Sequence, residues 1–401
     1  MSKGSRDGLR GPLVPHARGF GAALVQVGYS RSAAKKQLQL MARLSAWLDD
    51  EGLEPVDLAT AHVERFFHAR RVEGYANLLT SRSVAPLVQH LLGTKAIGAP
   101  APVVTSDPVA ALLERFRLYL VRERCLVDGT ARFYVHVARL LVSERVDADG
   151  VDLTGLRAGD VTSFATRTCA TRGLSSARQV VSALRSFLRF LILEGVTDLA
   201  LDQAVLSVAG WNPSLPRAIS AADVTRLLAS CDRRSRIGRR DYAMLILLSR
   251  LGLRGGEVVS LQLEDIDWRS GEITVHAKGG RRGRLPLPVD VGEALVAYLR
   301  CRPASEDRRV FLRGHAPFRG LSSTGAVRGV LARACQRAGM FYVSPHRLRH
   351  TTATEMLRAG APLAEIGQVL GHAGAVTTAI YAKVDYDRLR ALARPWPQVA
   401  A

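Results

Sequence analysis

Apolar residues return at helical spacing through most of the first two hundred positions. In segment 32–48 they stand at positions 38, 41, 44 and 48, which share one face of a helix. Weaker patterns of the same period continue to residue 92 and run again from 107 to 200. The pattern predicts two consecutive all-helical blocks. The strongest single stripe lies in segment 176–193 and consists of Val180, Leu184, Phe187, Leu188 and Leu191.

Proline-rich segments mark the ends of these blocks. Ala99-Pro100-Ala101-Pro102 predicts a linker over 98–106, and the run from Asn212 to Pro216 predicts a second linker over 205–219. Residues 1–20 precede the first clear pattern and are expected to form a loose basic tail. The parts expected to fold are residues 21–97, 107–204 and 220–395.

The two helical blocks share a sequence pattern. Val56-Asp57-Leu58 in the first block returns as Val151-Asp152-Leu153 in the second, and the apolar positions that follow keep their order at offsets of 95 to 98 residues. Pro86 stands against the comparison, because its counterpart Ala183 falls inside a predicted helix and proline disrupts a helix interior. A duplicated module and two unrelated helix bundles both remain open.

From residue 220 onward the pattern is mixed. Ser220 and Asp223 have the spacing of a capping box, with Asp in place of Glu or Gln, and segment 241–251 reads as a helix. Segment 271–276 predicts a strand, with 284–287 as its hairpin partner across a turn rich in glycine and arginine. Helical patterns return from residue 325. The expected fold class is a multidomain protein, all-α in its first two blocks and mainly α in the third, with a small antiparallel β-sheet.

The chain is strongly basic. It has 56 Lys and Arg against 36 Asp and Glu, so its formal net charge is +20 and its pI is near 10.6. This charge favours a polyanionic partner, although it does not separate DNA from RNA or from a membrane surface. The cations are almost all arginines; the lysines are Lys3, Lys35, Lys36, Lys95, Lys278 and Lys383.

Cysteine usage and apolar runs bear on the compartment. The 5 cysteines include no CxxC pair, which argues against a disulfide framework or a structural zinc site and suits a reducing compartment. The basic N-terminus has no following apolar stretch of signal-peptide length. The apolar run 244–248 is too short to span a membrane. We therefore expect a cytoplasmic protein.

A group of polar residues stands at set distances near the end of the chain. His346-Arg347-Leu348-Arg349-His350 is preceded by Arg254 and followed by Leu370-Gly371-His372 and then Tyr381. Alone, the HxxRH string reads as an exposed helix of a basic protein. The two histidines also have the spacing of a zinc-binding HExxH helix, but arginine replaces the glutamate base and Arg349 would repel a cation. Together these residues are the groups that cleavage of a phosphodiester through a covalent protein intermediate requires.

With these motifs the chain resembles a tyrosine recombinase of the phage integrase family. The matching stretches are 241–268, 271–288 and 344–384, in the family's order and spacing. The resemblance implies a DNA strand transferase that needs neither metal nor ATP, with its catalytic domain at 220–395. Gly255-Gly256 replaces the usual bulkier residue and serine, at a cost of roughly 1 kcal/mol for each glycine in a helix. Pro288 shortens the second strand, and neither departure is at a catalytic position.

The resemblance assigns a role to each matching residue. Tyr381 resembles the nucleophile, whose phenol oxygen would form a 3′-phosphotyrosyl link and release a 5′-hydroxyl. Arg254 and Arg349 resemble the pair that grips the non-bridging phosphate oxygens, a task that suits the guanidinium fork. Lys278 resembles the hairpin lysine that protonates the departing oxygen. Each residue also has a structural reading, as a packed tyrosine, as surface-helix arginines or as a solvated turn lysine.

The other polar residues of the motifs have supporting roles in this reading. His346 resembles the residue that assists deprotonation of the tyrosine, and His372 the donor of a hydrogen bond to the phosphate. His350 is expected to be structural, and Glu257 to hold an active-site group by a salt bridge. No metal and no cofactor is implied, since the lysine and the arginines supply the cations. Two rival tyrosines lack a neighbouring Gly-His motif: Tyr242 and Tyr342.

The same resemblance predicts how DNA is held. Residues 107–204 resemble the helical, SAM-like core-binding domain, which would close a C-shaped clamp on the duplex with the catalytic domain. Residues 21–97 lack the strand alternation of an arm-binding β-sheet domain and fit a second helical DNA-binding or subunit-contact module. A C-terminal helix around 389–393 would dock on a neighbouring subunit of a tetramer or pack on its own domain. The hairpin arginines expected along the DNA backbone, or else solvated, are Arg281, Arg282 and Arg284.

The function expected from these parts is site-specific recombination. The enzyme would cleave and rejoin double-stranded DNA at a site with inverted repeats, through a Holliday junction, for a mobile element, with or without accessory or partner recombinases. Resolution of chromosome or plasmid dimers shares this chemistry, but the added N-terminal block counts against it. A catalytically silent accessory subunit should have lost part of the catalytic set, and the helical block and tail disfavour a type IB topoisomerase. When bound to DNA the protein would be associated with the nucleoid.

Overall fold

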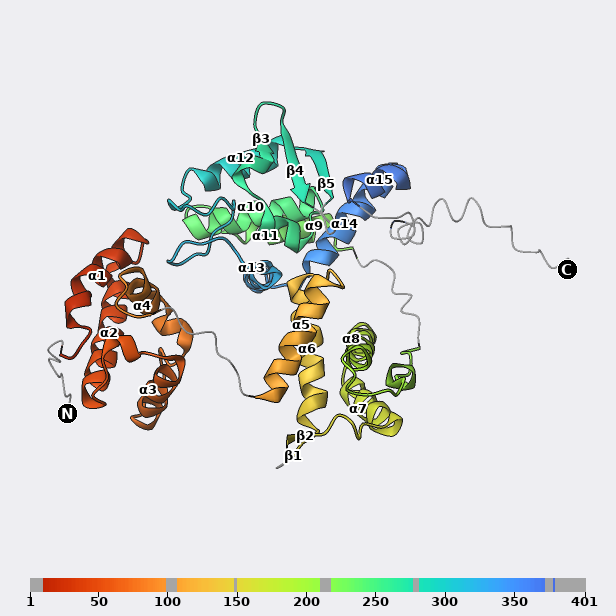
Figure 1. Cartoon of the computed structure of the whole chain (residues 1–401). Helices are drawn as coiled ribbons and strands as arrows, with labels where there is room; N and C mark the ends of the chain where they lie inside the picture. Colours follow the sequence, from red (N-terminus) through yellow and green to blue (C-terminus); the bar gives the residue numbers. More distant parts are fainter. Residues whose placement is uncertain are drawn as a thin grey trace. The chain divides into compact units, whose positions relative to one another are not determined.

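A computed structural model describes residues 10–98, 107–147, 150–209, 218–276, 281–371 and 378 (Figure 1). The chain forms two compact units, of which the first contains residues 1–99 and 214–401 and the second residues 100–213. No helix in the described ranges has the length and apolar character that crossing a membrane would need. All five cysteines carry free thiols.

Residues 10–98 form a helical module with its own hydrophobic core. Leu40, Leu44 and Leu48 of the second helix lie on one face and are at most 2% exposed, which confirms the helical pattern predicted over 32–48. Ser30 caps this helix by accepting a hydrogen bond from the Ala33 amide at 3.2 Å. The elements are η1 (Val14–His16), α1 (Ala17–Gln26), α2 (Arg31–Asp50), η2 (Pro55–Asp57), α3 (Thr60–Val72) and α4 (Ser81–Gly93).

The expected basic tail over residues 1–20 differs from the structure in its second half. Residues 14–20 are helical, and Leu13 and Phe20 are 0% and 1% exposed. Leu24, one turn after Phe20, completes an apolar face that packs against α2 and α4. Three apolar residues are too few for a helix to be predicted from their spacing. The burial of this helix depends on contacts with residues distant in sequence. Residues 1–9 lie outside the described part of the chain.

Pro86 lies inside α4 and does not end it. Its missing amide removes one helical hydrogen bond, and burial of Val84, Leu87 and Leu91 on the same helix offsets that cost. Ala183, its counterpart in the proposed repeat, also lies within a helix. The objection that Pro86 raised to a repeat is therefore wrong, although a shared pattern still does not separate duplication from two similar bundles.

The second unit is a helical bundle around an aromatic core. Phe116 and Phe187 meet edge to face with ring centroids 5.0 Å apart, and both are 0% exposed. Burying each such ring contributes about 1.5–3 kcal/mol. A short β-strand pair lies within this unit, which was expected to be all-α. The elements are α5 (Pro108–Arg122), α6 (Asp128–Ser143), β1 (Val146–Asp147), β2 (Gly150–Val151), α7 (Ala158–Ala170), α8 (Leu174–Leu193) and η3 (Leu201–Ala204).

Residues 218–371 contain a larger core and the sheet. Ser220 accepts a hydrogen bond from the Asp223 amide at 3.0 Å, which confirms the predicted helix start, while Asp223 pairs with Arg226 instead of closing a capping box. The elements are α9 (Ala221–Ala229), α10 (Arg236–Arg250), α11 (Gly255–Ser260), η4 (Leu263–Asp265), β3 (Ile266–Asp267), β4 (Glu272–His276), β5 (Arg282–Pro286), α12 (Val289–Leu299), α13 (Thr324–Arg337), α14 (Pro345–Arg358) and α15 (Leu363–Val369).

The sheet has three antiparallel strands in the order β3-β4-β5. The register runs from Glu272 opposite Pro286 to His276 opposite Arg282, so the predicted hairpin is confirmed and its second strand starts two residues earlier than expected. Leu285 lies on the buried face and Arg284 on the exposed face, because side chains alternate along a strand. The turn residues 277–280 lie outside the described ranges.

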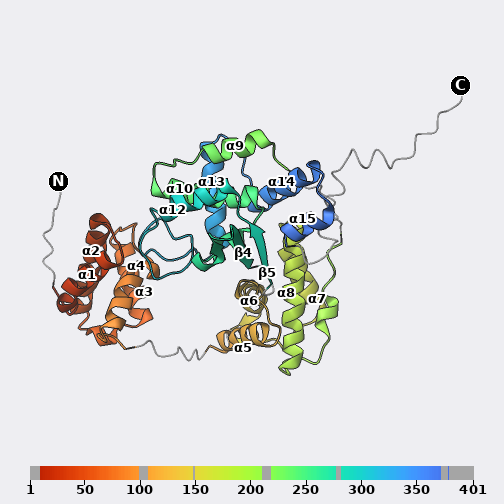
Figure 2. The ribbon, with the colours of Figure 1, turned by 90° about the horizontal axis from the view of Figure 1, so that it is seen from above.

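Helix α10 is the centre of this part of the chain. It packs against α12 and α14 (Figure 2), and nine of its fifteen residues are buried. Arg240 and Asp241 form a buried ion pair at 2.7 Å, and Arg240 also donates to the Leu312 carbonyl at 3.0 Å. Arg240 therefore ties the segment at Leu312 to α10. The loop that follows α10 carries Arg254.

Candidate active site

Arg254 stands immediately before α11 and is held by Glu257 of that helix. The Glu257 carboxylate accepts hydrogen bonds from the Arg254 backbone amide and from its guanidinium, both at 2.7 Å. The Glu257 side chain is 6% exposed and the Arg254 side chain 38% exposed. The salt bridge predicted for Glu257 is confirmed. It orients a guanidinium group that keeps an accessible edge.

Arg349 lies in α14 and is 2% exposed. Its guanidinium donates to the Gly252 carbonyl at 2.7 Å and to the Leu370 carbonyl. Arg254 in turn donates to the Gly371 carbonyl at 3.3 Å. The two arginines, 95 positions apart in the chain, therefore both bind the end of α15, and Arg349 also fixes the loop that carries Arg254.

Gly252 is required by this arrangement. Its φ of +60° lies in the left-handed region that side chains other than glycine rarely adopt. A Cβ atom at this position would stand 2.8 Å from the Leu370 side chain and 3.4 Å from Thr352. The glycine thus permits both the turn and the close approach of α14 and α15 that brings the arginines together.

Two histidines of α14 lie beside the arginines. The rings of His346 and His350 meet edge to face with centroids 4.2 Å apart. Burial, followed by the charges of Arg349 and Arg254, lowers the pKa of His346. Burial, followed by His346 and Arg349, lowers the pKa of His350 to about 4. Both imidazoles are therefore neutral near pH 7, and a neutral imidazole can accept a proton or a hydrogen bond.

A cavity of about 550 Å³ brings three predicted residues together: Arg254, His346 and Arg349. Arg328 of α13 and Tyr342 of the loop before α14 also line it, and sequence reasoning assigned neither to the site. Arg328 is exposed and forms no ion pair among the described residues. The signal available in the sequence was weak, since arginine is common throughout this chain.

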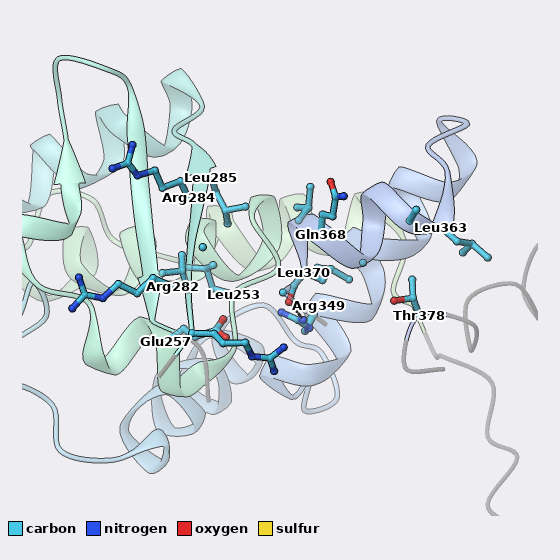
Figure 3. Close-up of a pocket in the computed structure, with 17 residues that line it drawn as sticks. Leu253, Glu257, Arg282, Arg284, Leu285, Arg349, Leu363, Gln368, Leu370 and Thr378 are labelled. Atoms are coloured by element: carbon cyan, nitrogen blue, oxygen red, sulfur yellow. Dashed lines mark hydrogen bonds between the residues drawn. The ribbon is translucent and has the colours of Figure 1, made fainter. Parts of the chain in front are cut away.

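A second cavity, of about 630 Å³, shares Arg349 with the first and is drawn in Figure 3. It is lined by the start of α11, the β4–β5 hairpin and α15. Figure 3 shows Arg282 and Arg284 extending from β5 away from Arg349 and Leu370. Arg284 lies 3.6 Å from the Glu272 carboxylate and its side chain is 77% exposed. The three hairpin arginines, Arg281, Arg282 and Arg284, are exposed and line the hairpin side of this cavity.

Lys278, His372 and Tyr381 lie outside the described residues. The strands on both sides of the Lys278 turn are described, and His276 binds Asp265 at 2.7 Å at the end of β4. Thr378 is described and is 4% exposed. It packs against α15, since a Cβ atom on Gly367 would stand 2.9 Å from its hydroxyl oxygen. The predicted C-terminal helix around 389–393 also falls outside the described part.

The polar groups of the site are poorly suited to a metal ion. Within the described ranges, no group of three or more His, Cys, Asp or Glu side chains could hold a metal ion. His346 and His350 stand instead among arginines, whose charges repel a cation. The donor set is suited to an anion.

Comparisons with known proteins agree with this chemistry. Residues 217–388 match the model of the Phage integrase family. The chain is 41% identical to a putative integrase/recombinase, y4rA, of Sinorhizobium fredii over 392 residues, which cover 96% of this chain and 95% of that protein. It is 32% identical to the tyrosine recombinase XerD of Listeria monocytogenes over 291 residues, 70% of this chain and 96% of XerD. The chain belongs to the phage integrase family of tyrosine recombinases and is an enzyme of that class.

Solved structures support the fold. The site-specific recombinase XerH bound to a palindromic difH substrate aligns with a TM-score of 0.53 at 16% identity, over 72% of this chain and 97% of that one. Residues 75–356 of lambda integrase, a dimer bound to a COC′ core site, align with a TM-score of 0.51 at 17% identity. The alignment covers 67% of this chain and 96% of that one. The predicted fold class, mainly helical with a small antiparallel sheet in the catalytic part, is confirmed.

Proposed function

We propose that this tyrosine recombinase cleaves and rejoins double-stranded DNA at a specific site to integrate, excise or transpose a mobile element. The observation that carries the proposal is the meeting of Arg254, Arg349 and His346 at one cavity. These groups supply two permanent cations and a neutral base next to each other, which suits a phosphodiester in which negative charge increases during reaction.

The chemistry follows from the residues in this order. The phenol oxygen of Tyr381 attacks phosphorus, and the bond from phosphorus to the 5′-oxygen breaks. Lys278 donates a proton to the departing oxygen, which leaves as a 5′-hydroxyl. Attack by a 5′-hydroxyl from a second duplex reverses these steps, restores the phosphodiester and releases the tyrosine. Two such exchanges pass through a Holliday junction, and no ATP is consumed because the phosphotyrosyl bond conserves the energy.

The described residues have distinct tasks in this scheme. Arg254 presents its accessible edge to a non-bridging oxygen, and buried Arg349 holds the loop and the end of α15 in place while lining the same cavity. His346, kept neutral at pH 7, accepts the proton of the tyrosine. His372 donates a hydrogen bond to the phosphate, and His350 packs behind His346 as a structural residue.

The position of Thr378 is compatible with Tyr381 as the nucleophile. Thr378 lines the second cavity, which contains Arg349. Three residues of chain span at most about 11 Å. Tyr381 follows Thr378 by three positions in the sequence, whereas the rival Tyr242 packs against the core beside Arg233. Tyr342 lines the first cavity, and we assign it a DNA contact.

We also propose the modular roles of the chain. Residues 107–204 act as the core-binding domain, residues 220–395 as the catalytic domain with a C-terminal helix for subunit contact, and residues 21–97 as a further DNA-binding module. A basic tail (1–9) precedes these modules, and linkers at 98–106 and 205–219 join them. The enzyme acts in the cytoplasm as a tetramer on two sites with inverted repeats. Backbone contacts come from Arg281, Arg282, Arg284 and Arg328.

Service to a mobile element is favoured over dimer resolution by the extent of the matches. The putative integrase/recombinase y4rA aligns with 96% of this chain, so it shares most of the N-terminal module. XerD aligns with 70% of this chain while 96% of XerD is used, so a substantial part of this chain has no counterpart there. The extra module is the feature that separates the two roles.

The test is a covalent adduct assay with the full chain. Nicked suicide duplexes, built from the DNA that flanks the gene, are incubated with the wild-type enzyme and with Tyr381→Phe, and SDS-resistant protein–DNA adducts are measured. An adduct with the wild type alone supports the proposal. An adduct with both proteins would mean that another residue is the nucleophile. Tyr342→Phe would then test whether Tyr342 is that residue. Tight, sequence-preferring binding without any adduct favours an accessory subunit. EDTA should leave adduct formation unchanged.

A further inference from the structure

The N-terminal module contains a buried arginine whose guanidinium is only partly satisfied within the described residues. Arg70 of α3 is 5% exposed, and its Nε and one terminal nitrogen have no hydrogen-bond partner among the described residues. No salt bridge to Arg70 is present in that part of the chain either. A buried guanidinium without a partner is unfavourable, because its charge has lost water and gained no anion. Most such groups in proteins are paired.

The backbone places an aromatic ring over this arginine. The Tyr75 amide donates to the Arg70 carbonyl at 3.0 Å, and the Gly74 amide to the Arg71 carbonyl at 3.0 Å, with Gly74 at a φ of +85°. This is the Schellman arrangement that ends a helix, in which the two residues at the positions of Arg70 and Tyr75 usually make a hydrophobic contact. Here an arginine occupies one of these positions, and its contact with the Tyr75 ring is a cation–π contact at 4.5 Å, with the Phe66 ring 5.7 Å away on the same helix.

A second arginine meets the same ring from another helix. The guanidinium carbons of Arg43, in α2, and of Arg70 both lie 4.5 Å from the centre of the Tyr75 ring. The two cations therefore stand within twice that distance of each other. Burial first, and the charge of Arg43 second, lowers the pKa of Arg70. Glu73 is nearby but forms no salt bridge with either arginine in the described structure.

The two side chains that lie over Arg70 are themselves at the surface of the module. Tyr75 is 39% exposed and Arg43 is exposed. An anion at this surface would contact exposed Arg43 directly and would lie close to Arg70, since both guanidinium carbons are 4.5 Å from the centre of one ring. It would replace the missing counter-charge of both cations at once. Arginine is the residue best suited to a phosphate, because its donors match the phosphate oxygens.

We propose that Arg43, Arg70 and Tyr75 form a phosphate site through which the N-terminal module binds the backbone of duplex DNA. The proposal deepens the role given above to residues 21–97 and rests on that proposed function. DNA is the favoured source of the phosphate because the chain has a net charge of +20 and belongs to a family of DNA recombinases. The contact sets affinity and position and reads no sequence.

The test measures the salt dependence of DNA binding by the full chain. Fluorescence anisotropy with a labelled duplex of arbitrary sequence gives the slope of log affinity against log salt concentration. Arg43→Gln and Arg70→Met should each reduce the magnitude of this slope by about 0.9, the value for one phosphate contact. Arg31→Gln is the matched control. It removes an exposed arginine of the same helix, twelve residues or about 18 Å from Arg43, and should leave the slope unchanged.

Thermal unfolding separates this site from a structural role. Arg70→Met removes a buried, unpaired charge and keeps the apolar contacts, so the midpoint should stay or rise while the DNA slope falls. A lower midpoint with an unchanged slope would make Arg70 a packing residue and overturn the proposal. Equal slope changes in all three variants would indicate diffuse attraction and overturn it too.

Inorganic phosphate distinguishes the source of the anion. At constant ionic strength, phosphate should raise the unfolding midpoint of the wild type more than that of Arg43→Gln. If it does so while the DNA slopes of the variants equal that of the wild type, the site takes free anions and the assignment to DNA is wrong. The covalent adduct assay is independent of this result, because it measures cleavage by the catalytic domain, whereas the slopes measure DNA affinity. Loss of adduct formation in the wild type would refute the recombinase proposal and leave the slopes unaffected.

Discussion

Removal of the Glu257 carboxylate should loosen Arg254 without removing its charge. In Glu257→Ala the helix α11 loses its capping interaction, which is worth about 1 kcal/mol, and Arg254 loses its ion pair. The Arg254 side chain is 38% exposed, so solvent screens that pair and we assign it about 1 kcal/mol. The free energy of unfolding should fall by about 2 kcal/mol in total. Glu257→Gln keeps an acceptor for the Arg254 amide and should lose about half as much.

The effect on the reaction is smaller than that of deleting a donor. Loss of one transition-state donor typically costs about 10²- to 10³-fold, but here the guanidinium remains and only its orientation is lost. We expect about a tenfold slower cleavage for Glu257→Ala, measured under single-turnover conditions with a nicked suicide duplex, with the affinity for DNA unchanged. Urea unfolding gives the stability change on the same samples.

A matched surface pair provides the control for this prediction. Glu355 and Arg358 of α14 form an exposed ion pair at 3.0 Å, with the same three-residue spacing and side chains 48% and 69% exposed. Glu355→Ala should change stability by less than about 0.5 kcal/mol and leave cleavage unchanged. If Glu257→Ala behaves like Glu355→Ala in both assays, the capping pair does not position Arg254 and the reasoning fails.

Three further predictions concern protonation, backbone shape and the leaving group. The pKa of His350 is lowered from 6.5 to about 4, so the unfolded chain binds more protons and stability should fall as the pH drops from about 6.5 to 4, by up to about 3 kcal/mol. Urea unfolding of His350→Gln should show a flatter dependence of stability on pH, and a dependence equal to that of the wild type would contradict the shift. Gly252→Ala should lower stability by about 1–3 kcal/mol and slow cleavage, whereas Gly271→Ala, at a similar φ of +65° with nothing within 4 Å, should show the conformational cost alone; equal losses in both would mean that the contact with Leu370 is unimportant. Lys278→Ala should cleave slowly but recover on a duplex with a 5′-bridging phosphorothiolate, whose thiolate leaves without a proton; equal defects on both substrates would exclude Lys278 as the acid.

Some of the site could be predicted from the sequence and some could not. The spacing of Arg254, His346 and Arg349 matched a family, and the structure brings these three residues to one cavity. Nothing local marked Arg328 or Tyr342, because a surface arginine and a loop tyrosine carry no periodic signal. Their place at the cavity depends on how α13 and the loop before α14 pack against α11.

Local patterns in the sequence determined the helices α2 and α8, the β4–β5 hairpin and the family of the enzyme. Periods of two and 3.6 residues follow from backbone geometry within a few residues. The spacing between the family's motif residues can be read from the sequence directly. Only the tertiary structure decided that Phe20 is buried, that α4 continues through Pro86, that Arg349 binds the carbonyls of Gly252 and Leu370, and that Arg70 lies against the Tyr75 ring with no ion pair in the described part of the chain. Burial and partner choice arise from contacts between segments far apart in sequence, and no local pattern encodes them.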